Sequence, residues 1–205
     1  MNIKDKVILI TGAGKGSGRI LAKALAERGA IIAANDISPI NVEDAVVEIN
    51  KSGGQAKAYI EDVAKKVGAQ HLIKQVEDEF GRIDVLINHA SVQPNTTLLN
   101  MDEWDWHRVL DVNLTGTFLM TQSVGRVMRD QGSGVIINLI AANQETVKND
   151  APHQGTAAFV ASMQGLKGFT RQAALELNPY GIQVHAVETR SGIVERVFAL
   201  LEKKP

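Results

Sequence analysis

The chain contains no cysteine, which excludes disulfides, thiolate nucleophiles, cysteine-bound zinc and iron–sulfur clusters. No apolar run approaches the roughly 18 residues that span a bilayer. Residues 1–6 lack the basic-then-apolar layout of a secretory signal. Neither sign of charge is in excess, because 22 Lys and Arg residues stand against 23 Asp and Glu. Nothing therefore points to nucleic acid or a membrane surface as a partner, and a cytoplasmic protein is expected.

The composition is that of an ordinary globular domain. Of the 205 residues, 44% are hydrophobic and 22% are charged, which excludes an intrinsically disordered or collagen-like chain. No linker, repeat or low-complexity segment divides the sequence. We therefore expect a single domain over residues 1–205.

Short β-branched apolar runs alternate with longer amphipathic stretches. Strands are expected at 7–10, 31–35, 56–60, 84–88, 135–140 and 183–187, and helices at 18–28, 42–49, up to Phe80, 101–129 and 156–177. Strand–helix alternation at this spacing indicates a parallel sheet, because parallel strands need a crossover connection. The prediction is a doubly wound α/β domain, or Rossmann fold, with three layers in the order α/β/α.

A glycine-rich stretch, residues 11–18, joins the first expected strand to the first expected helix. Glycines there let the backbone turn tightly, and a helix N-terminus offers free N–H groups to a pyrophosphate. An acidic residue, Asp36, follows the second strand and can accept hydrogen bonds from an adenosine ribose. Two plainer interpretations remain open: a flexible turn, and an aspartate that caps the next helix.

These motifs resemble the short-chain dehydrogenase/reductase family over nearly the whole chain, in particular its 3-oxoacyl-ACP reductase and glucose dehydrogenase branch. The Thr-Gly-x-x-x-Gly-x-Gly pattern of the family is matched within residues 11–18. Asp62-Val63 resembles the pair that touches the adenine ring in the family. Residues 88–91 resemble the Asn-Asn-Ala-Gly turn with two departures, and Asn113 matches the helix asparagine of the family's active site.

The resemblance implies a nicotinamide dinucleotide as cofactor and no metal. Asp36 would repel a 2′-phosphate, which favours NAD. Lys15 can pair with such a phosphate, which favours NADP, or can simply be solvated. We prefer NAD, because a carboxylate beside the ribose is the more exclusive feature. The expected cofactor contacts are Gly12, Gly14, Lys15, Gly16, Ser17, Gly18, Asp36, Ile37, Asp62, Val63, Asn88 and Ala90.

The catalytic groups that the resemblance implies are largely missing. Family members use a tyrosine as proton donor, a lysine four residues later and a serine after the fifth strand. The two tyrosines of this chain, Tyr59 and Tyr180, are each followed four residues later by valine. By resemblance the serine, tyrosine and lysine positions are Ala141, Phe159 and Met163, and only Asn113 remains of the catalytic group of four.

The three replacements remove the acid–base chemistry. Phenylalanine has no ionisable proton, methionine no charge and alanine no side-chain donor. General acid–base catalysis contributes roughly 10²–10⁴-fold and an oxyanion donor on the order of 10²–10³-fold. His153 is an alternative acid, since its reference pKa lies near neutrality, although a solvent-exposed loop histidine is the plainer interpretation.

The last part of the chain departs from the family. Glu188 to Gly192 lack the family's Pro-Gly turn, and one amphipathic helix follows at 193–201. The substrate lid and the seventh strand are therefore expected to be missing. The edge of the sixth strand then needs a cover, from the terminal helix or from a partner chain.

Three functions remain open on the sequence alone. The first is a pseudoenzyme that binds a nicotinamide dinucleotide but has lost turnover, with a binding or regulatory role. The second is an NAD(P)-dependent oxidoreductase that acts on a carbonyl or alcohol with a non-standard acid. The third is a structural partner subunit without nucleotide. Family members often assemble through two long helices, here 101–129 and 156–177, so a homo-oligomer or pairing with a related subunit is expected.

Overall fold

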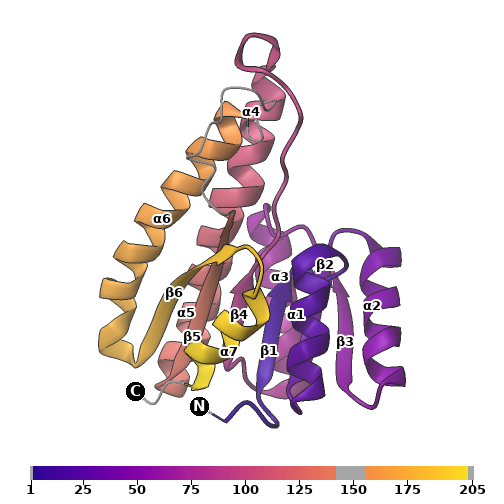
Figure 1. Ribbon diagram of the computed structural model, residues 1–205. Coiled ribbons are helices and arrows are strands. Elements are labelled where there is room, and N and C mark those ends of the chain that lie inside the picture. Colours follow the sequence, from indigo (N-terminus) through magenta and orange to yellow (C-terminus); the bar gives the residue numbers. More distant parts are fainter. Residues whose placement is uncertain (1, 142–155, 203–205) are drawn as a thin grey trace.

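The computed structural model describes residues 2–141 and 156–202, whose strands form one sheet in the order β3-β2-β1-β4-β5-β6 (Figure 1). All neighbouring strands are parallel. This confirms the predicted doubly wound α/β fold. The strands are β1 (Val7–Thr11), β2 (Ile31–Asp36), β3 (Gln55–Ile60), β4 (Val85–Asn88), β5 (Gly134–Ala141) and β6 (Ile182–Thr189).

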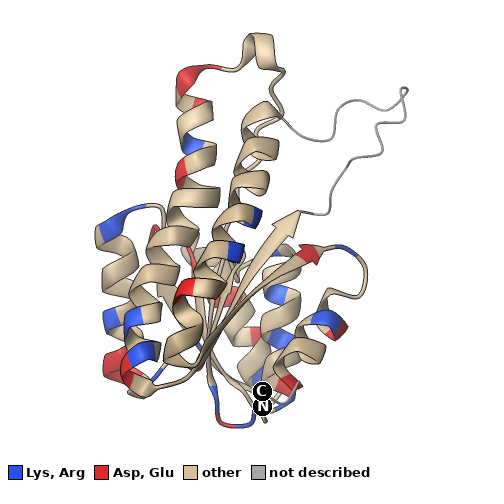
Figure 2. Ribbon diagram, turned by 90° about the vertical axis from the view of Figure 1, so that its left-hand side faces the viewer, with Lys and Arg blue, Asp and Glu red and all other residues tan. Residues whose placement is uncertain are grey.

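Helices cover both faces of the sheet, as the turned view in Figure 2 shows. The helices are α1 (Gly16–Glu27), α2 (Pro39–Lys51), α3 (Lys66–Phe80), α4 (Glu103–Leu110), α5 (Thr117–Gln131), α6 (Ala157–Leu177) and α7 (Ile193–Glu202). Alternate residues of a strand point to opposite faces. Ile8 and Ile10 of β1 therefore pack with α1, α2 and α7, whereas Val7 and Leu9 pack with α3, α5 and α6. None of the helices in the described ranges is long and apolar enough to cross a membrane.

The helix expected at 101–129 is not one regular α-helix. A π-helical segment, η2 (Asp111–Gly116), lies between α4 and α5. The Thr117 hydroxyl donates to the Asn113 carbonyl oxygen at 3.0 Å, and Gly116 passes so close to the loop after β3 that a Cβ would lie 3.2 Å from the Val63 carbonyl oxygen. Such wide turns occur often at functional sites, and here the turn sets Asn113 in the interior of the protein.

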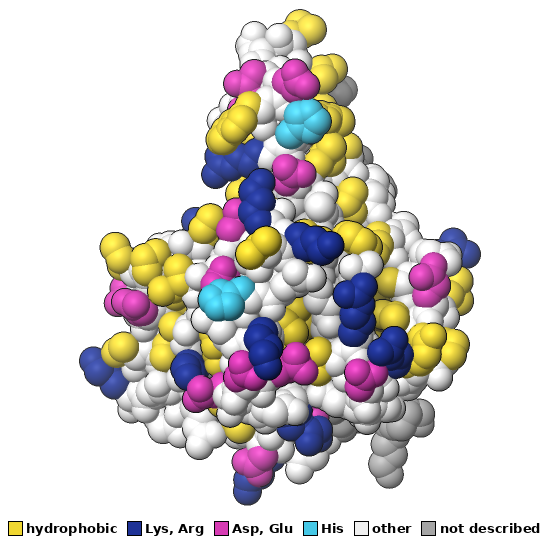
Figure 3. Space-filling view, turned by 180° about the vertical axis from the view of Figure 1, so that it is seen from behind, with side chains coloured by type: hydrophobic (Ala, Val, Ile, Leu, Met, Phe, Trp, Pro, Cys, Tyr) yellow, Lys and Arg dark blue, Asp and Glu magenta, His cyan; other side chains and the backbone are white. Residues whose placement is uncertain are grey.

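The segment before η2 projects beyond the carboxyl edge of the sheet (Figures 1 and 3). It contains the short 3₁₀ helix η1 (Leu98–Asn100) and α4. The side chains of Leu99 and Trp104 are 96% and 63% exposed there, and the Trp104 ring lies 5.0 Å from the Arg108 guanidinium. Trp104 and Arg108 also line a cavity at the base of this projection.

The terminal helix α7 follows β6 after a tight turn. The Arg196 guanidinium holds this turn by donating to the carbonyl oxygens of Glu188, Arg190 and Ser191, at 2.6–2.9 Å. Phe198 of α7 packs into the core beside α1, where the Arg28 guanidinium lies 3.9 Å from its ring. In the described part of the chain α7 therefore covers a sheet face, and β6 pairs with β5 alone.

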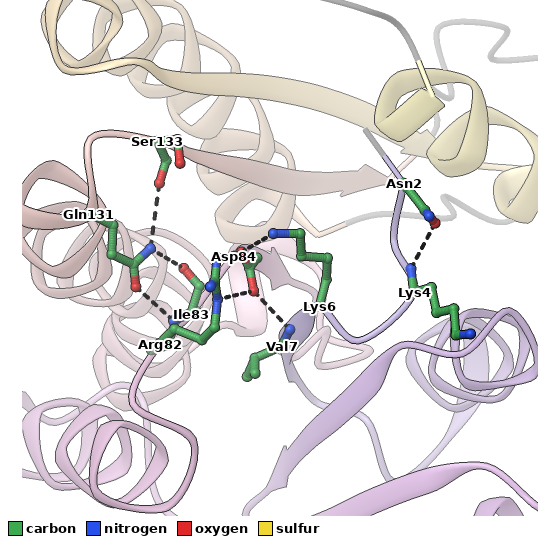
Figure 4. A network of polar contacts seen from close by, with 9 residues as sticks. All are labelled: Asn2, Lys4, Lys6, Val7, Arg82, Ile83, Asp84, Gln131 and Ser133. Atoms are coloured by element: carbon green, nitrogen blue, oxygen red, sulfur yellow. Dashed lines mark hydrogen bonds and ion pairs between the residues drawn. The ribbon is translucent and has the colours of Figure 1, made fainter.

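The amino-terminal edge of the sheet is fixed by Asp84, just before β4 (Figure 4). Its carboxylate accepts from the Val7 backbone N–H at 3.0 Å, the Lys6 ammonium at 3.1 Å and Arg82 Nε at 2.8 Å. Gln131, which ends α5, accepts from the Ile83 backbone N–H at 3.0 Å and donates to the Ile83 carbonyl oxygen at 2.9 Å. The starts of β1 and β4 and the end of α5 are thereby joined.

Asp84→Asn is expected to lower the free energy of unfolding by about 1–3 kcal/mol at pH 7, because charge-assisted hydrogen bonds are lost. Burial alone raises the pKa of Asp84, but the bonds from Arg82, Val7 and Lys6 outweigh it and hold that pKa below its usual value. The contribution is therefore complete above about pH 4 and is lost as the pH falls through the lowered pKa. Urea unfolding between pH 3 and 7 measures both effects.

The exposed ion pair of Asp78 with Lys74 on α3 provides the matched control. Asp78→Asn should cost less than about 0.5 kcal/mol, since exposed pairs at this spacing contribute little. Equal losses in the two variants, or a loss at Asp84 that does not diminish below pH 4, would contradict the assigned role of the buried carboxylate.

Candidate functional site

The glycine-rich turn brings backbone N–H groups to the N-terminus of α1. Gly12 has φ +65°, and a Cβ there would lie 2.9 Å from the Ala90 Cα. A Cβ on Gly18 would overlap the Gly12 carbonyl oxygen and lie 2.6 Å from His89 Nδ1. Lys15, the N-cap residue of α1, makes no side-chain cap bond within the described chain, and the first turn carries no acidic residue. The first amides of α1 are thus available to an anion.

Asp36 ends β2 beside this turn and is almost completely buried. Its two carboxylate oxygens accept from the backbone N–H groups of Gly14 and Ser38, both at 3.0 Å. The helix cap is Ser38, whose hydroxyl accepts from the Asn41 N–H. Asp36 therefore holds the glycine-rich turn against β2 and lines the adjacent cavity, while Ser38 caps α2.

The part of the cavity next to Asp36 is lined by both apolar and polar groups. Ile37 is 69% exposed, whereas Val63 is buried. The Asp62 carboxylate accepts from the Ala64 N–H at 3.0 Å. Asn35, which sequence reasoning missed, donates to the Tyr59 and Glu61 carbonyl oxygens and so fixes the chain that carries Asp62. This arrangement suits a flat aromatic base with polar edges.

Seven of the twelve expected cofactor residues line one cavity of about 500 Å³, at the carboxyl ends of β1, β2, β3 and β4. They are Gly12, Lys15, Asp36, Ile37, Asp62, Val63 and Ala90. The glycine-rich turn and first turn of α1 hold Gly14, Gly16, Ser17 and Gly18 beside it. Asn88 lies beneath the cavity, where it donates to the Asn138 and Thr121 side chains at 2.8 and 3.3 Å. Their contacts with a nucleotide stay a prediction.

His89 is a second residue whose role the sequence did not reveal. Its Nδ1 lies 3.0 Å from the Gly12 carbonyl oxygen, which can only accept, so Nδ1 carries the proton. Burial lowers the pKa of His89, although Gly12 and Asp36 act in the opposite direction. The Thr11 hydroxyl accepts from the N–H groups of His89 and Ala90, both at 3.1 Å. A neutral imidazole thus supports the glycine-rich turn. The departure from Asn-Asn-Ala-Gly at this position was the available signal.

The three positions that the resemblance assigns to a catalytic serine, tyrosine and lysine come together in space. Ala141 ends β5, and Phe159 and Met163 lie one turn apart on α6. All three belong to one apolar cluster with Ile140, Leu166 and Leu114. The Met163 sulfur accepts from the Ala141 N–H at 3.4 Å, and only 6% of Met163 is exposed. The described members of this cluster carry no titratable side chain.

Asn113 is held beside this cluster by its own hydrogen bonds. Its amide donates to the Val92 carbonyl oxygen and the Ser162 hydroxyl, both at 3.0 Å, and accepts from the Val92 N–H at 2.8 Å. Asn113 therefore joins η2, the loop after β4 and α6. His153, the alternative acid, lies outside the described residues. Among the described residues no group of three or more metal-ligating side chains is present.

Known proteins resemble this chain in sequence and fold. A family model described as short chain dehydrogenase matches residues 6–195. A 3-oxoacyl-[acyl-carrier-protein] reductase of Synechocystis sp. is 41% identical over 183 residues, which are 89% of this chain and 72% of the reductase. An NAD+-bound xylitol dehydrogenase has a TM-score of 0.83 at 31% identity, over 98% of this chain and 77% of its own. A metagenomic short-chain oxidoreductase in complex with NADP has a TM-score of 0.89 at 26% identity, over 100% and 93%.

Proposed function

This chain belongs to the short chain dehydrogenase family, and on that premise we propose that it binds a nicotinamide dinucleotide without efficient turnover. A bound nicotinamide supplies or accepts a hydride. The protein has to supply a proton and hold the reacting oxygen. The proposed role is therefore binding or regulation, and the loss of the acid–base groups is what separates this chain from a working reductase.

Support for binding comes from the cavity beside α1. The family likeness, with solved relatives that hold NAD+ and NADP, supports a nicotinamide dinucleotide as the ligand. A Cβ at Gly12 or Gly18 would collide with neighbouring backbone atoms, so the tight turn requires glycine there. The uncapped start of α1 suits a pyrophosphate. Ile37 and Val63 would enclose the adenine, and Asp36 would accept from the ribose hydroxyls. These residues fit the adenosine half of the cofactor.

The observation that carries the loss of turnover is the contact of the Met163 sulfur with the Ala141 N–H. A lysine and a serine would stand at these positions in an active member of the family. Methionine and alanine instead close on each other within an apolar cluster that also contains Phe159. No described member of this cluster carries a side-chain proton that could be donated to a substrate oxygen.

The proposed ligand is NAD, with NADP as the competing choice. Asp36 carries a carboxylate into the cavity, where a 2′-phosphate would meet like charge. Lys15 lines the same cavity and is exposed, so its ammonium remains solvated when the phosphate is absent. The carboxylate, fixed by two backbone N–H groups, determines the preference.

Assembly through the two long helices also stays a prediction. Phe118 of α5 and Leu175 of α6 are 40% and 66% exposed. Their exposure supports pairing with a second copy or with a related subunit along α5 and α6.

Fluorescence titration with NADH and NADPH, followed by assays with a panel of ketones and alcohols, tests the proposed function. We expect saturable binding and no turnover above the uncatalysed rate. Gly18→Ala should weaken binding by at least about tenfold, which is ~1.4 kcal/mol, because the new methyl group displaces the Gly12 carbonyl.

Gly168→Ala is the matched control. A Cβ at Gly168 in α6 meets nothing within 4 Å, so binding should be unchanged and the free energy of unfolding should rise by about 0.5–1 kcal/mol. Turnover by the wild-type chain that His153→Ala abolishes would establish the oxidoreductase with a non-standard acid. A folded chain that binds no nucleotide at millimolar concentration would establish the structural subunit instead.

A further inference from the structure

The positions assigned to the catalytic serine, tyrosine and lysine do not line the open cavity. Its described lining runs from Asp62 and Ile37 at one end, past Asp36, to the loop after β4, α4 and the start of η2. Ala141, Phe159 and Met163 belong to the apolar cluster instead. The space that the described residues leave for a ligand thus lies at the carboxyl ends of β1 to β4 and does not include this cluster.

Polar groups at the reaction centre are already paired within the chain. Both N–H bonds of the Asn113 amide are used, by Val92 and Ser162, and its oxygen accepts from Val92. The Ser162 hydroxyl donates to the Phe159 carbonyl oxygen at 2.7 Å. The Ala141 N–H is directed at the Met163 sulfur. Asn113, Ser162 and the Ala141 N–H therefore keep no free donor for ribose hydroxyls or for a carboxamide at this end.

The adenosine end of the cavity differs in its chemistry from the apolar cluster around Met163. At the adenosine end, the Asp36 carboxylate, the apolar side chains of Ile37 and Val63 and the uncapped start of α1 lie together at the cavity. A ligand gains affinity where its polar groups find partners, and it gains little where a desolvated polar group meets hydrocarbon. The nicotinamide and its ribose would meet hydrocarbon and a thioether.

We infer that the site recognises adenosine 5′-diphosphate compounds as a class and is indifferent to the group at the distal end, including the redox state of a nicotinamide. This inference rests on the proposed function, because it concerns the same cavity. It goes further by placing the affinity in one half of the ligand. ADP and ADP-ribose are then ligands equivalent to NAD and NADH.

Isothermal titration of the full chain with ADP, ADP-ribose, NAD, NADH and nicotinamide mononucleotide tests the inference. The first four should bind with dissociation constants within about threefold of one another, and the mononucleotide should show no binding at millimolar concentration. NAD or NADH binding at least about tenfold more tightly than ADP-ribose would overturn the inference while leaving the proposed function standing. The absence of binding by all five would overturn both.

A gain-of-function variant adds an independent readout. Met163→Lys provides an ammonium donor at the distal end, so the affinity for NAD should rise about tenfold relative to that for ADP, with ADP itself unchanged. Ala161→Lys adds the same charge at an exposed position of α6 and should leave the ratio unaltered. If Met163→Lys left the ratio of NAD affinity to ADP affinity unchanged, the inference that this position causes the weak binding of the nicotinamide half would be overturned.

Discussion

Introducing the three groups that the family resemblance places at these positions, as Ala141→Ser, Phe159→Tyr and Met163→Lys, is expected to raise ketone reduction measurably above that of the unaltered chain. Phe159 and Met163 lie four residues apart on α6, so a tyrosine and a lysine there share one face of the helix. Ala141 ends β5 against the same cluster. A positioned acid contributes roughly 10²–10⁴-fold and an oxyanion donor on the order of 10²–10³-fold. Steady-state oxidation of NADH with a ketone panel should therefore show at least about a hundredfold gain.

The matched control keeps Phe159 and changes only the other two positions. This double variant has the lysine and the serine hydroxyl but lacks the proton donor, so its rate should stay below that of the triple variant by roughly the 10²–10⁴-fold that a positioned acid contributes. Circular dichroism and nucleotide titration establish that each variant folds and binds, since Met163 is buried and a lysine there costs stability. A triple variant that folds, binds nucleotide and remains inert would disprove the idea that these three positions account for the missing activity.

The second large effect concerns nucleotide choice. Asp36→Asn should lower the ratio of the NADP to the NAD dissociation constant by about 10–100-fold. Two unit charges about 4 Å apart interact by about 4 kcal/mol at an effective dielectric constant of 20, and the substitution removes that repulsion from a 2′-phosphate. Lys15 lines the same cavity, and its ammonium then has a phosphate to pair with. Competition titrations of both nucleotides against NADH fluorescence measure the ratio.

The amide side chain of the Asp36→Asn variant keeps an acceptor oxygen for one of the two backbone N–H groups that the carboxylate now holds. NAD binding should therefore weaken only modestly, by about tenfold at most, through the loss of a charge-assisted bond. Asp44→Asn on the exposed side of α2 removes the same charge away from the cavity and is the control. A ratio that stays constant in Asp36→Asn would mean that this carboxylate does not select the nucleotide.

Local sequence patterns predict the helices and strands well, and the features that they did not predict share one cause. The pattern ends a helix at Phe80, where α3 indeed ends, and Gly81 follows with φ +69°. The segment predicted as one helix from residue 101 instead contains η2, because Gly116 packs against a loop more than fifty residues earlier in the chain. Asp36, which the sequence presents as a ribose acceptor or a helix cap, also holds Gly14 by a hydrogen bond. Each miss depends on a contact between distant segments, which periodicity does not encode.

The sequence by itself determined the parallel sheet, the glycine-rich turn at its centre and the absence of any tyrosine followed four residues later by lysine. Alternating patterns and residue identities are local properties, so they can be read without coordinates. Only the tertiary structure decided that Ala141, Phe159 and Met163 close into one apolar cluster, that Asn113 is fully hydrogen-bonded, and that a neutral His89 supports the turn beneath the cavity. The physical reason is that the parallel pairing of β1, β4 and β5, together with the packing of α6 against β5 and η2, brings these residues together across tens of intervening positions.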